Sequence, residues 1–180
     1  MESGKQFPLS EIVHVDEFTV GGKEEGKRGR SYDSKKKKVV IAVELTKKHK
    51  IRRVYIKSID DCSAKSLTPI FEEHISMDAQ VFTDKWRGYG PIAKTYNITQ
   101  NYSRQGRNFK ELHIIRQQVK SWLRVIPTHA SKEHVQIYFD EFCFRINRSQ
   151  FKETIWHKTI ERLINQKPLF HHQIKQRLSV

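Results

Sequence analysis

The sequence EIVHVDEFTVGG, residues 11–22, decides how the rest of the chain is interpreted, because it combines a strand with an acidic group. Its apolar and β-branched residues predict a strand, and the glycine pair that follows predicts a turn. Asp16 closes the run Ile12–Asp16, so we expect this carboxylate at a strand end, where the backbone holds it rigidly. Because side chains alternate between the faces of a strand, Asp16 and Glu17 point to opposite faces, and only one of them can join a given site.

The order of the other predicted elements indicates an α/β domain. Apolar runs predict strands over residues 39–43, 51–56, 79–84 and 97–102, and periodic apolar positions predict helices over residues 64–75, 92–96, 112–126, 131–146 and 151–165. Short connections make the first three strands an antiparallel meander. This order fits a ribonuclease-H-like mixed sheet with flanking helices and a helical C-terminal extension, a fold that binds metal through carboxylates on its first and fourth strands.

A second aspartate, Asp84, ends the predicted fourth strand. Asp16 and Asp84 therefore stand where the ribonuclease-H-like fold needs its metal ligands. Mg²⁺ prefers oxygen ligands and takes one or two carboxylates from a protein. Two such ions about 4 Å apart can assist both the attacking and the leaving oxygen of phosphoryl transfer. The pair predicts a metal-dependent site, whereas a lone aspartate at a strand end is more often a turn former.

The composition indicates a polyanionic partner. The 34 lysines and arginines outnumber the 20 acidic residues, which gives a net charge of +14. Such an excess is typical of proteins that bind nucleic acid or an anionic membrane surface. No apolar run approaches the roughly 18 residues of a membrane span. Nucleic acid is favoured over a membrane surface, because the basic residues are not confined to one amphipathic helix.

A polar and basic segment, residues 23–38, follows the first predicted strand. Its charge bias favours an arm that contacts the DNA backbone, and the alternative is a solvated loop. The candidate DNA-binding residues of this arm are Lys23, Lys27, Arg28 and Arg30.

The two cysteines, Cys62 and Cys143, indicate neither a disulfide framework nor a zinc ribbon. The N-terminus has no signal-peptide core, so a cytoplasmic location is expected. The chain opens almost directly on its first strand. We therefore expect either that it lacks an N-terminal DNA-reading module or that it is a fragment of something longer.

The predicted helix over residues 112–126 carries candidate partners of the two aspartates. His113 and Lys120 are seven residues apart, nearly two helical turns, so their side chains share a face. That face also offers Arg116, Gln117 and Arg124. Such a helix could place a third ligand and several cations beside the aspartates, and the alternative is a solvated basic face with an ordinary histidine.

Glu111 competes with His113 as the third ligand. It lies nine residues before Lys120, so in a continuous helix it points half a turn away from that residue. If the helix begins later, Glu111 could reach the metals from a loop.

Several short motifs together resemble those of insertion-sequence DDE transposases. The matching segments are HVDEFTVGGK (residues 14–23), TDKWRGY (83–89), KSWLR (120–124), SKEH (131–134), YFDEF (138–142) and FRINR (144–148). The ordered set is specific, although each piece alone is weak. The resemblance implies a ribonuclease-H-like catalytic domain that uses Mg²⁺ or Mn²⁺ to cut and join the DNA at transposon ends.

The resemblance also implies roles for individual residues. Asp16 and Asp84 would be the first two metal ligands, and Lys120 would contact a DNA phosphate near the cleaved bond. The family's third ligand is usually a glutamate seven residues before the lysine, a position that His113 occupies here, as in related insertion sequences with Asn or His at this place. Imidazole suits Mn²⁺ or Zn²⁺ better than Mg²⁺.

These observations predict a transposase catalytic domain over residues 8–149 and a C-terminal helical extension over residues 150–180. Its expected activity is metal-dependent cleavage and transfer of DNA strands, as a homo-oligomer assembled on double-stranded transposon ends and target DNA. Lys120 and Arg124 join the basic arm as predicted DNA contacts. Two alternatives stay open: a related nuclease that cuts without joining, and a truncated or non-catalytic DNA-binding remnant, which His113 favours.

Overall fold

A computed structural model describes residues 7–21, 36–102, 108–125, 135–149, 151 and 153–165. Lys23, Lys27, Arg28 and Arg30 of the predicted basic arm lie outside these residues, as do Ser131 and the SKEH motif. The strands are β1 (Ile12–Val20), β2 (Lys37–Leu45), β3 (Ile51–Ile59), β4 (Gln80–Thr83) and β5 (Ile98–Gln100). The helices are α1 (Ala64–His74), α2 (Lys110–Val125), α3 (Val135–Arg148) and α4 (Ile155–Asn165), with short 3-10 helices η1 (Arg87–Tyr89) and η2 (Ile92–Lys94).

Within the described residues, five strands form one mixed sheet with the order β3-β2-β1-β4-β5. The predicted meander is confirmed, because β1 pairs with β2 and β2 pairs with β3 in antiparallel fashion. β4 and β5 join on the other side of β1 as parallel strands. The protein is therefore of the α/β class, and the arrangement is compatible with a ribonuclease-H-like fold.

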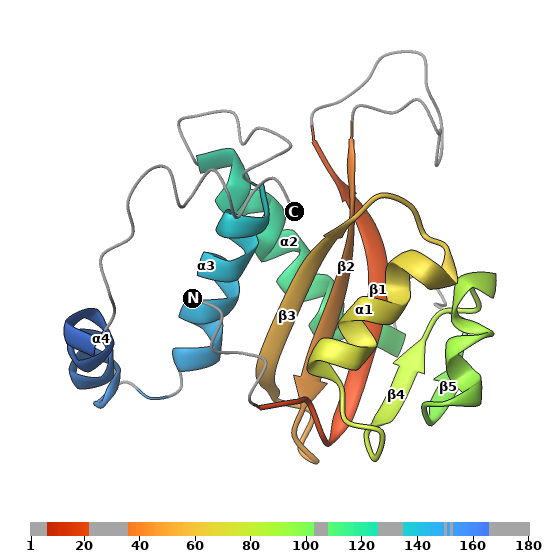
Figure 1. The fold of residues 1–180 in the computed structure, drawn as a ribbon, viewed down its shortest axis with the longest axis horizontal. Coiled ribbons are helices and arrows are strands. Elements are labelled where there is room, and N and C mark those ends of the chain that lie inside the picture. The colour runs from red at the N-terminus through yellow and green to blue at the C-terminus, as the bar shows by residue number, and fades with distance from the viewer. Residues whose placement is uncertain are drawn as a thin grey trace.

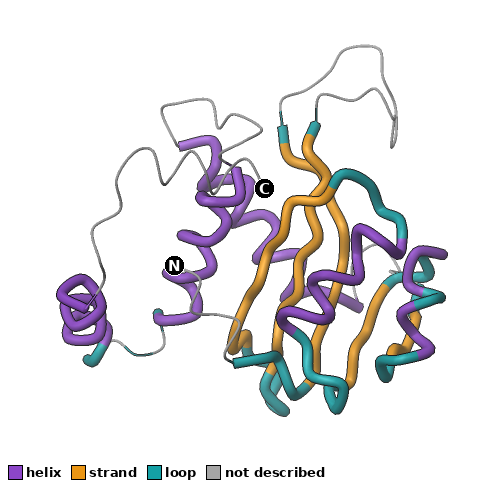
Figure 2. Tube along the Cα trace, viewed as in Figure 1, coloured by secondary structure: helices purple, strands orange, loops and turns teal. Residues whose placement is uncertain are grey.

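Helices cover both faces of the sheet, so β2 is buried on each side (Figure 1). Val39, Ile41 and Val43 face the core formed with α2 and α3, whereas Val40 and Ala42 face the core formed with α1 and the 3-10 helices. This alternation explains why the strand has a continuous apolar run. α4 stands away from the sheet (Figure 2). None of the helices in the described part of the chain is long and apolar enough to cross a membrane.

The prediction that Asp16 ends its strand is wrong. Asp16 is the fifth of nine residues in β1, and the strand continues because Glu17 to Val20 pair with β2. On its other side, however, β1 pairs with β4 only as far as Val15, opposite Thr83. Asp16 therefore lies where β1 loses its parallel neighbour rather than where the strand itself stops.

α3 packs along β3, the edge strand of the sheet, and two of its amide side chains bond to that strand. Asn147 accepts a hydrogen bond from the Val54 amide at 2.7 Å and donates to the Val54 carbonyl at 2.9 Å. Gln136 does the same for the Ser58 amide at 2.8 Å and the Ile56 carbonyl at 3.0 Å. These backbone groups lie on the side of β3 away from β2, so α3 takes the place of a further strand.

Candidate active site

The sheet register brings the two predicted metal ligands to neighbouring positions. Val15 of β1 is paired with Thr83 of β4, and the next residues are Asp16 and Asp84. The two strands are parallel, so both aspartates follow the last pair of the ladder at the same edge. Asp84 is held in the turn after β4, where its carboxylate accepts a hydrogen bond of 3.0 Å from the Trp86 amide.

Tyr89 lies close enough to both aspartates to be influenced by their charges. Burial raises the pKa of its hydroxyl well above the usual range, and the charges of Glu17, Asp16 and Asp84 raise it further. The phenol is therefore neutral and donates its proton in a hydrogen bond of 2.8 Å to the Glu17 carboxylate. Tyr89 and Glu17 are buried on the face of the sheet that α1 covers, so this bond lies on the face opposite the Asp16 side chain.

α2 runs along β1 and places polar side chains against successive positions of that strand. The charge of Glu111 acts on His14, Arg116 reaches Asp16, and the Lys120 ammonium lies 5.5 Å from the centre of the Phe18 ring. These helix positions are four or five residues apart, while the strand positions are two apart. The spacing is consistent because two residues of strand and about four residues of helix cover similar distances.

Arg116 contacts Asp16 from α2. One guanidinium nitrogen lies 3.4 Å from the Oδ2 atom of Asp16. Both side chains are largely buried. The sequence placed Arg116 on the same helix face as His113 and Lys120, but it gave no reason to pair this arginine with the aspartate.

His113 is partly buried, and both nitrogens of its ring are buried without a hydrogen-bond partner among the residues that the structure describes. Burial lowers the pKa of His113, and the nearby positive charge of Arg116 lowers it further, so the imidazole is neutral. A neutral ring can ligate a metal or accept a hydrogen bond. Buried polar atoms are normally satisfied, so these two nitrogens are an anomaly that a ligand could resolve.

Glu111 lies in the first turn of α2, which begins at Lys110. The alternative in which Glu111 reaches the metals from a loop is therefore not what the structure shows. Burial lowers the pKa of His14, and the Glu111 charge opposes this effect. The charge of Glu111 thus acts on His14, which lies two residues before Asp16 on the same face of β1.

Four cations gather along the same side of α2. Burial lowers the pKa of Lys120, and the charges of Arg116, Arg124 and Lys36 lower it further. Lys36 immediately precedes β2, and Arg124 is exposed in the last turn of α2. Like charges repel one another, so a cluster of this kind is stabilised by an anion such as a phosphate.

The comparison with protein families provides the deciding observation. The model of the ISXO2-like transposase domain matches residues 8–147, more than three quarters of the chain. The chain belongs to this family of insertion-sequence transposases. Comparisons with curated proteins and with solved structures gave no match.

The transposase motif TDKWRGY has a structural role in addition to carrying Asp84. The Trp86 indole donates a hydrogen bond of 2.7 Å to the Cys62 carbonyl, which ties the turn after β4 to the start of α1. A Cβ atom at Gly88 would come within 2.6 Å of that same carbonyl oxygen, so only glycine fits. The motif thus fixes the backbone on both sides of Asp84 and buries Tyr89.

The donor atoms of this transposase site fit a divalent cation in part. Asp16 and Asp84 provide carboxylate oxygens from neighbouring strands, and Mg²⁺ commonly needs no more protein ligands than these, since water and substrate phosphates complete its shell. Among the residues that the structure describes, no three His, Cys, Asp or Glu side chains gather closely enough to hold a metal ion. A metal held by Asp16 and Asp84 alone would therefore take its other ligands from water and substrate phosphates.

Proposed function

We propose that this chain is a DDE-type transposase catalytic domain over residues 8–149, with residues 150–180 as a helical extension. Its activity is the hydrolysis of a phosphodiester at a transposon end, followed by attack of the freed 3′-hydroxyl on a phosphodiester of target DNA. The observation that supports the proposal is the register of β1 and β4, in which Asp16 and Asp84 each come directly after the last paired residues, Val15 and Thr83. Family membership supports it independently.

Asp16 and Asp84 would hold Mg²⁺ or Mn²⁺, with His113 as the candidate third ligand. Bound metal supplies Lewis acidity, which stabilises negative charge on the reacting phosphate oxygens. The ribonuclease-H-like fold is part of this proposal, because in that fold the metal ligands occupy these two strands.

The remaining residues bind and orient the DNA. Lys120 and Arg124 would contact backbone phosphates, and the basic arm with Lys23, Lys27, Arg28 and Arg30 would extend this contact. Lys120 is partly buried, and its ammonium lies 5.5 Å from the centre of the Phe18 ring. A homo-oligomer on DNA would bring two transposon ends together.

Strand cleavage by the full chain tests the proposal. The chain is incubated with Mn²⁺ or Mg²⁺ and a plasmid that carries the DNA flanking its coding region, and end-labelled products are separated on gels. We expect cleaved and joined products, and a loss of at least a hundredfold in Asp16→Asn and in Asp84→Asn. Asp78→Asn, which removes an exposed carboxylate before β4, should retain activity.

The other outcomes distinguish the rival functions. Cleavage without joining, even with pre-cut ends, would identify a nuclease that does not transfer strands. DNA binding without any metal-dependent cleavage would identify a non-catalytic remnant, a candidate that the Arg116–Asp16 pair and the histidine at position 113 both favour.

A further inference from the structure

Arg116 places a positive charge on a carboxylate that the proposed function assigns to metal. Its guanidinium lies 3.4 Å from Asp16, with 31% of the arginine side chain and 17% of the aspartate side chain exposed. The pair is therefore only partly screened by solvent. Arg116 is exposed enough for its guanidinium to turn towards a molecule that binds at this edge of the sheet.

Arg116 also stands between the two other functional candidates on α2. It follows His113 by three residues and precedes Lys120 by four, so all three side chains share one face of the helix. Burial lowers the pKa of both neighbours, and the charge of Arg116 adds to this effect in each case. The same arginine thus lies within electrostatic reach of the first proposed metal ligand, the third candidate ligand and the proposed phosphate contact.

A guanidinium and a divalent cation compete for one carboxylate. The two cations repel each other, so whichever occupies Asp16 weakens binding of the other. A DNA phosphate changes this balance, because the planar fork of an arginine matches the geometry of phosphate oxygens and binds them by two parallel hydrogen bonds. Phosphate and Asp16 are therefore alternative partners for Arg116, and its transfer to the phosphate leaves the carboxylate to the metal.

We propose that Arg116 is a positioning residue that couples metal binding to DNA binding: its guanidinium holds Asp16 in the free protein and moves to a backbone phosphate when DNA arrives. Free protein then binds metal weakly, and DNA-bound protein binds it tightly. By thermodynamic linkage, metal strengthens DNA binding by the same factor. The inference rests on the proposed function, because it requires Asp16 to be a metal ligand.

Binding of Mn²⁺ to the full chain in the absence of DNA tests the inference without relying on activity. The bound fraction is measured from the electron paramagnetic resonance signal of free Mn²⁺. We expect Arg116→Gln to bind Mn²⁺ on the order of tenfold more tightly than the wild type. Arg116→Lys keeps the charge and should bind it about as weakly as the wild type.

Arg145→Gln is the matched control for the loss of one positive charge. Arg145 also pairs with a carboxylate, Glu141, at 2.6 Å, but on the exposed surface of α3. This variant should leave the affinity for Mn²⁺ unchanged. If Arg116→Gln does not show a cooperative unfolding transition, Arg116→Met, which keeps a long unbranched stem, serves as the neutral variant.

DNA binding provides the second arm of the experiment. The affinity for a duplex of the flanking DNA is measured at several salt concentrations in the presence of Mn²⁺. Loss of one phosphate contact in Arg116→Gln should make the negative slope of log K against log salt shallower by about one.

Two results would overturn the inference, and they are distinguishable. If the wild type binds Mn²⁺ in a manner that Asp84→Asn abolishes, but Arg116→Gln binds it no more tightly, Arg116 is only a structural partner of Asp16 and the proposed function stands. If no variant binds Mn²⁺ through the aspartates, the proposed function fails and the inference fails with it.

Discussion

Glu17 is buried on the face of β1 opposite Asp16, where it accepts a hydrogen bond from the Tyr89 hydroxyl. The bond joins β1 to the 3-10 helix that follows Asp84 by three residues. It therefore links the two segments that carry the proposed metal ligands, on the face of the sheet that α1 covers. The residue next to Asp16 has no place in the site itself but fixes the backbone that the site depends on.

Tyr89→Phe tests this link. The substitution removes one hydrogen bond to a charged group and leaves the ring in the core, so we expect the free energy of unfolding to fall by about 1–3 kcal/mol. Urea unfolding followed by tryptophan fluorescence provides the measurement. Tyr102→Phe, at an exposed tyrosine, is the control and should change stability by less than about 0.5 kcal/mol. Equal stability of the two variants would show that the Tyr89 bond contributes nothing.

At the scale of elements, α3 both packs on the sheet and forms hydrogen bonds with the backbone of its edge strand, β3. The side-chain amides of Asn147 and Gln136 bond to backbone groups of β3 that have no neighbouring strand to pair with in the part of the chain that the structure describes. Cys143 lies between these two residues on the same face of the helix. Burial raises the pKa of its thiol far above its usual range, although the Ile56 backbone opposes the effect, so Cys143 is neutral and acts as a core residue. The match to the transposase family ends at residue 147, the position of the second amide.

Asn147→Ala and Gln136→Ala should each lower the free energy of unfolding by about 1–3 kcal/mol, because two backbone groups lose their partners in each variant. Hydrogen exchange offers a sharper readout. The Val54 amide should exchange faster in Asn147→Ala, and the Ser58 amide should exchange faster in Gln136→Ala. The matched control is Gln118→Ala, which truncates an exposed amide on α2. Unchanged protection at both positions would contradict the role assigned to α3.

Much of this arrangement could be predicted from the sequence, because it depends on periodicity. The apolar run in β2 indicated a strand buried on both faces, and spacings of three and four in α2 indicated a helix with one apolar side. The strand itself was predicted correctly up to the glycine pair, but Asp16 was wrongly placed at a strand end because aspartate is unusual within a strand, whereas pairing with β2 holds the residues beyond it. The bonds of Asn147 and Arg116 could not be predicted, because they depend on how two helices dock on the sheet.

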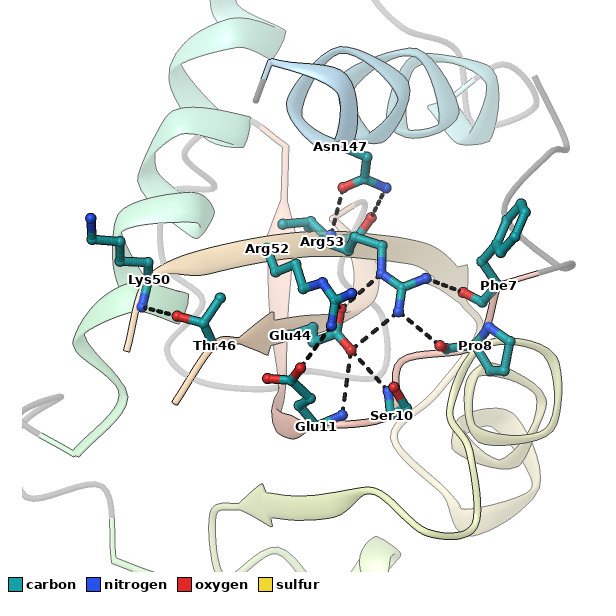
Figure 3. A network of polar contacts seen from close by, with 11 residues as sticks. Phe7, Pro8, Ser10, Glu11, Glu44, Thr46, Lys50, Arg52, Arg53 and Asn147 are labelled. Atoms are coloured by element: carbon teal, nitrogen blue, oxygen red, sulfur yellow. Dashed lines mark hydrogen bonds and ion pairs between the residues drawn. The ribbon is translucent and has the colours of Figure 1, made fainter. Parts of the chain in front are cut away.

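At the scale of the whole molecule, Glu44 anchors the segment before β1 to the far end of β2 (Figure 3). Its fully buried carboxylate accepts hydrogen bonds from Arg53 at 2.7 Å and from the Ser10 amide at 2.9 Å. Arg53 in turn donates to the carbonyls of Phe7 and Pro8. One acidic residue thus joins β2, β3 and the entry of the chain into the sheet.

This network makes a prediction about pH. Burial raises the pKa of Glu44, but the hydrogen bonds from Arg53 and Ser10 and the charges of Arg53 and Arg52 outweigh it and leave the pKa below its usual 4.5. A carboxyl group whose pKa is lower in the folded state stabilises the fold above its unfolded pKa, and this contribution is lost as the pH falls through the folded value. The wild type should therefore lose stability below about pH 4.5.

Glu44→Gln isolates this contribution. At pH 7 the variant should be less stable by about 3 kcal/mol, because Arg53 loses its charged partner. The difference should shrink as the pH falls through the lowered pKa of Glu44, where the wild-type carboxylate becomes protonated. Urea unfolding of both proteins at several pH values provides the test. A difference in stability that does not change with pH would show that the charge of Glu44 is not what stabilises the network.

The side chains by which α3 bonds to β3 have a consequence for assembly. An outermost strand with unpaired backbone groups can pair with a strand of another molecule, which is a common route to association between identical chains and to aggregation. Here β3 already has such bonds from within the molecule. Two copies brought together on DNA are therefore not expected to join through β3, because Asn147 and Gln136 already occupy outer backbone groups of that strand.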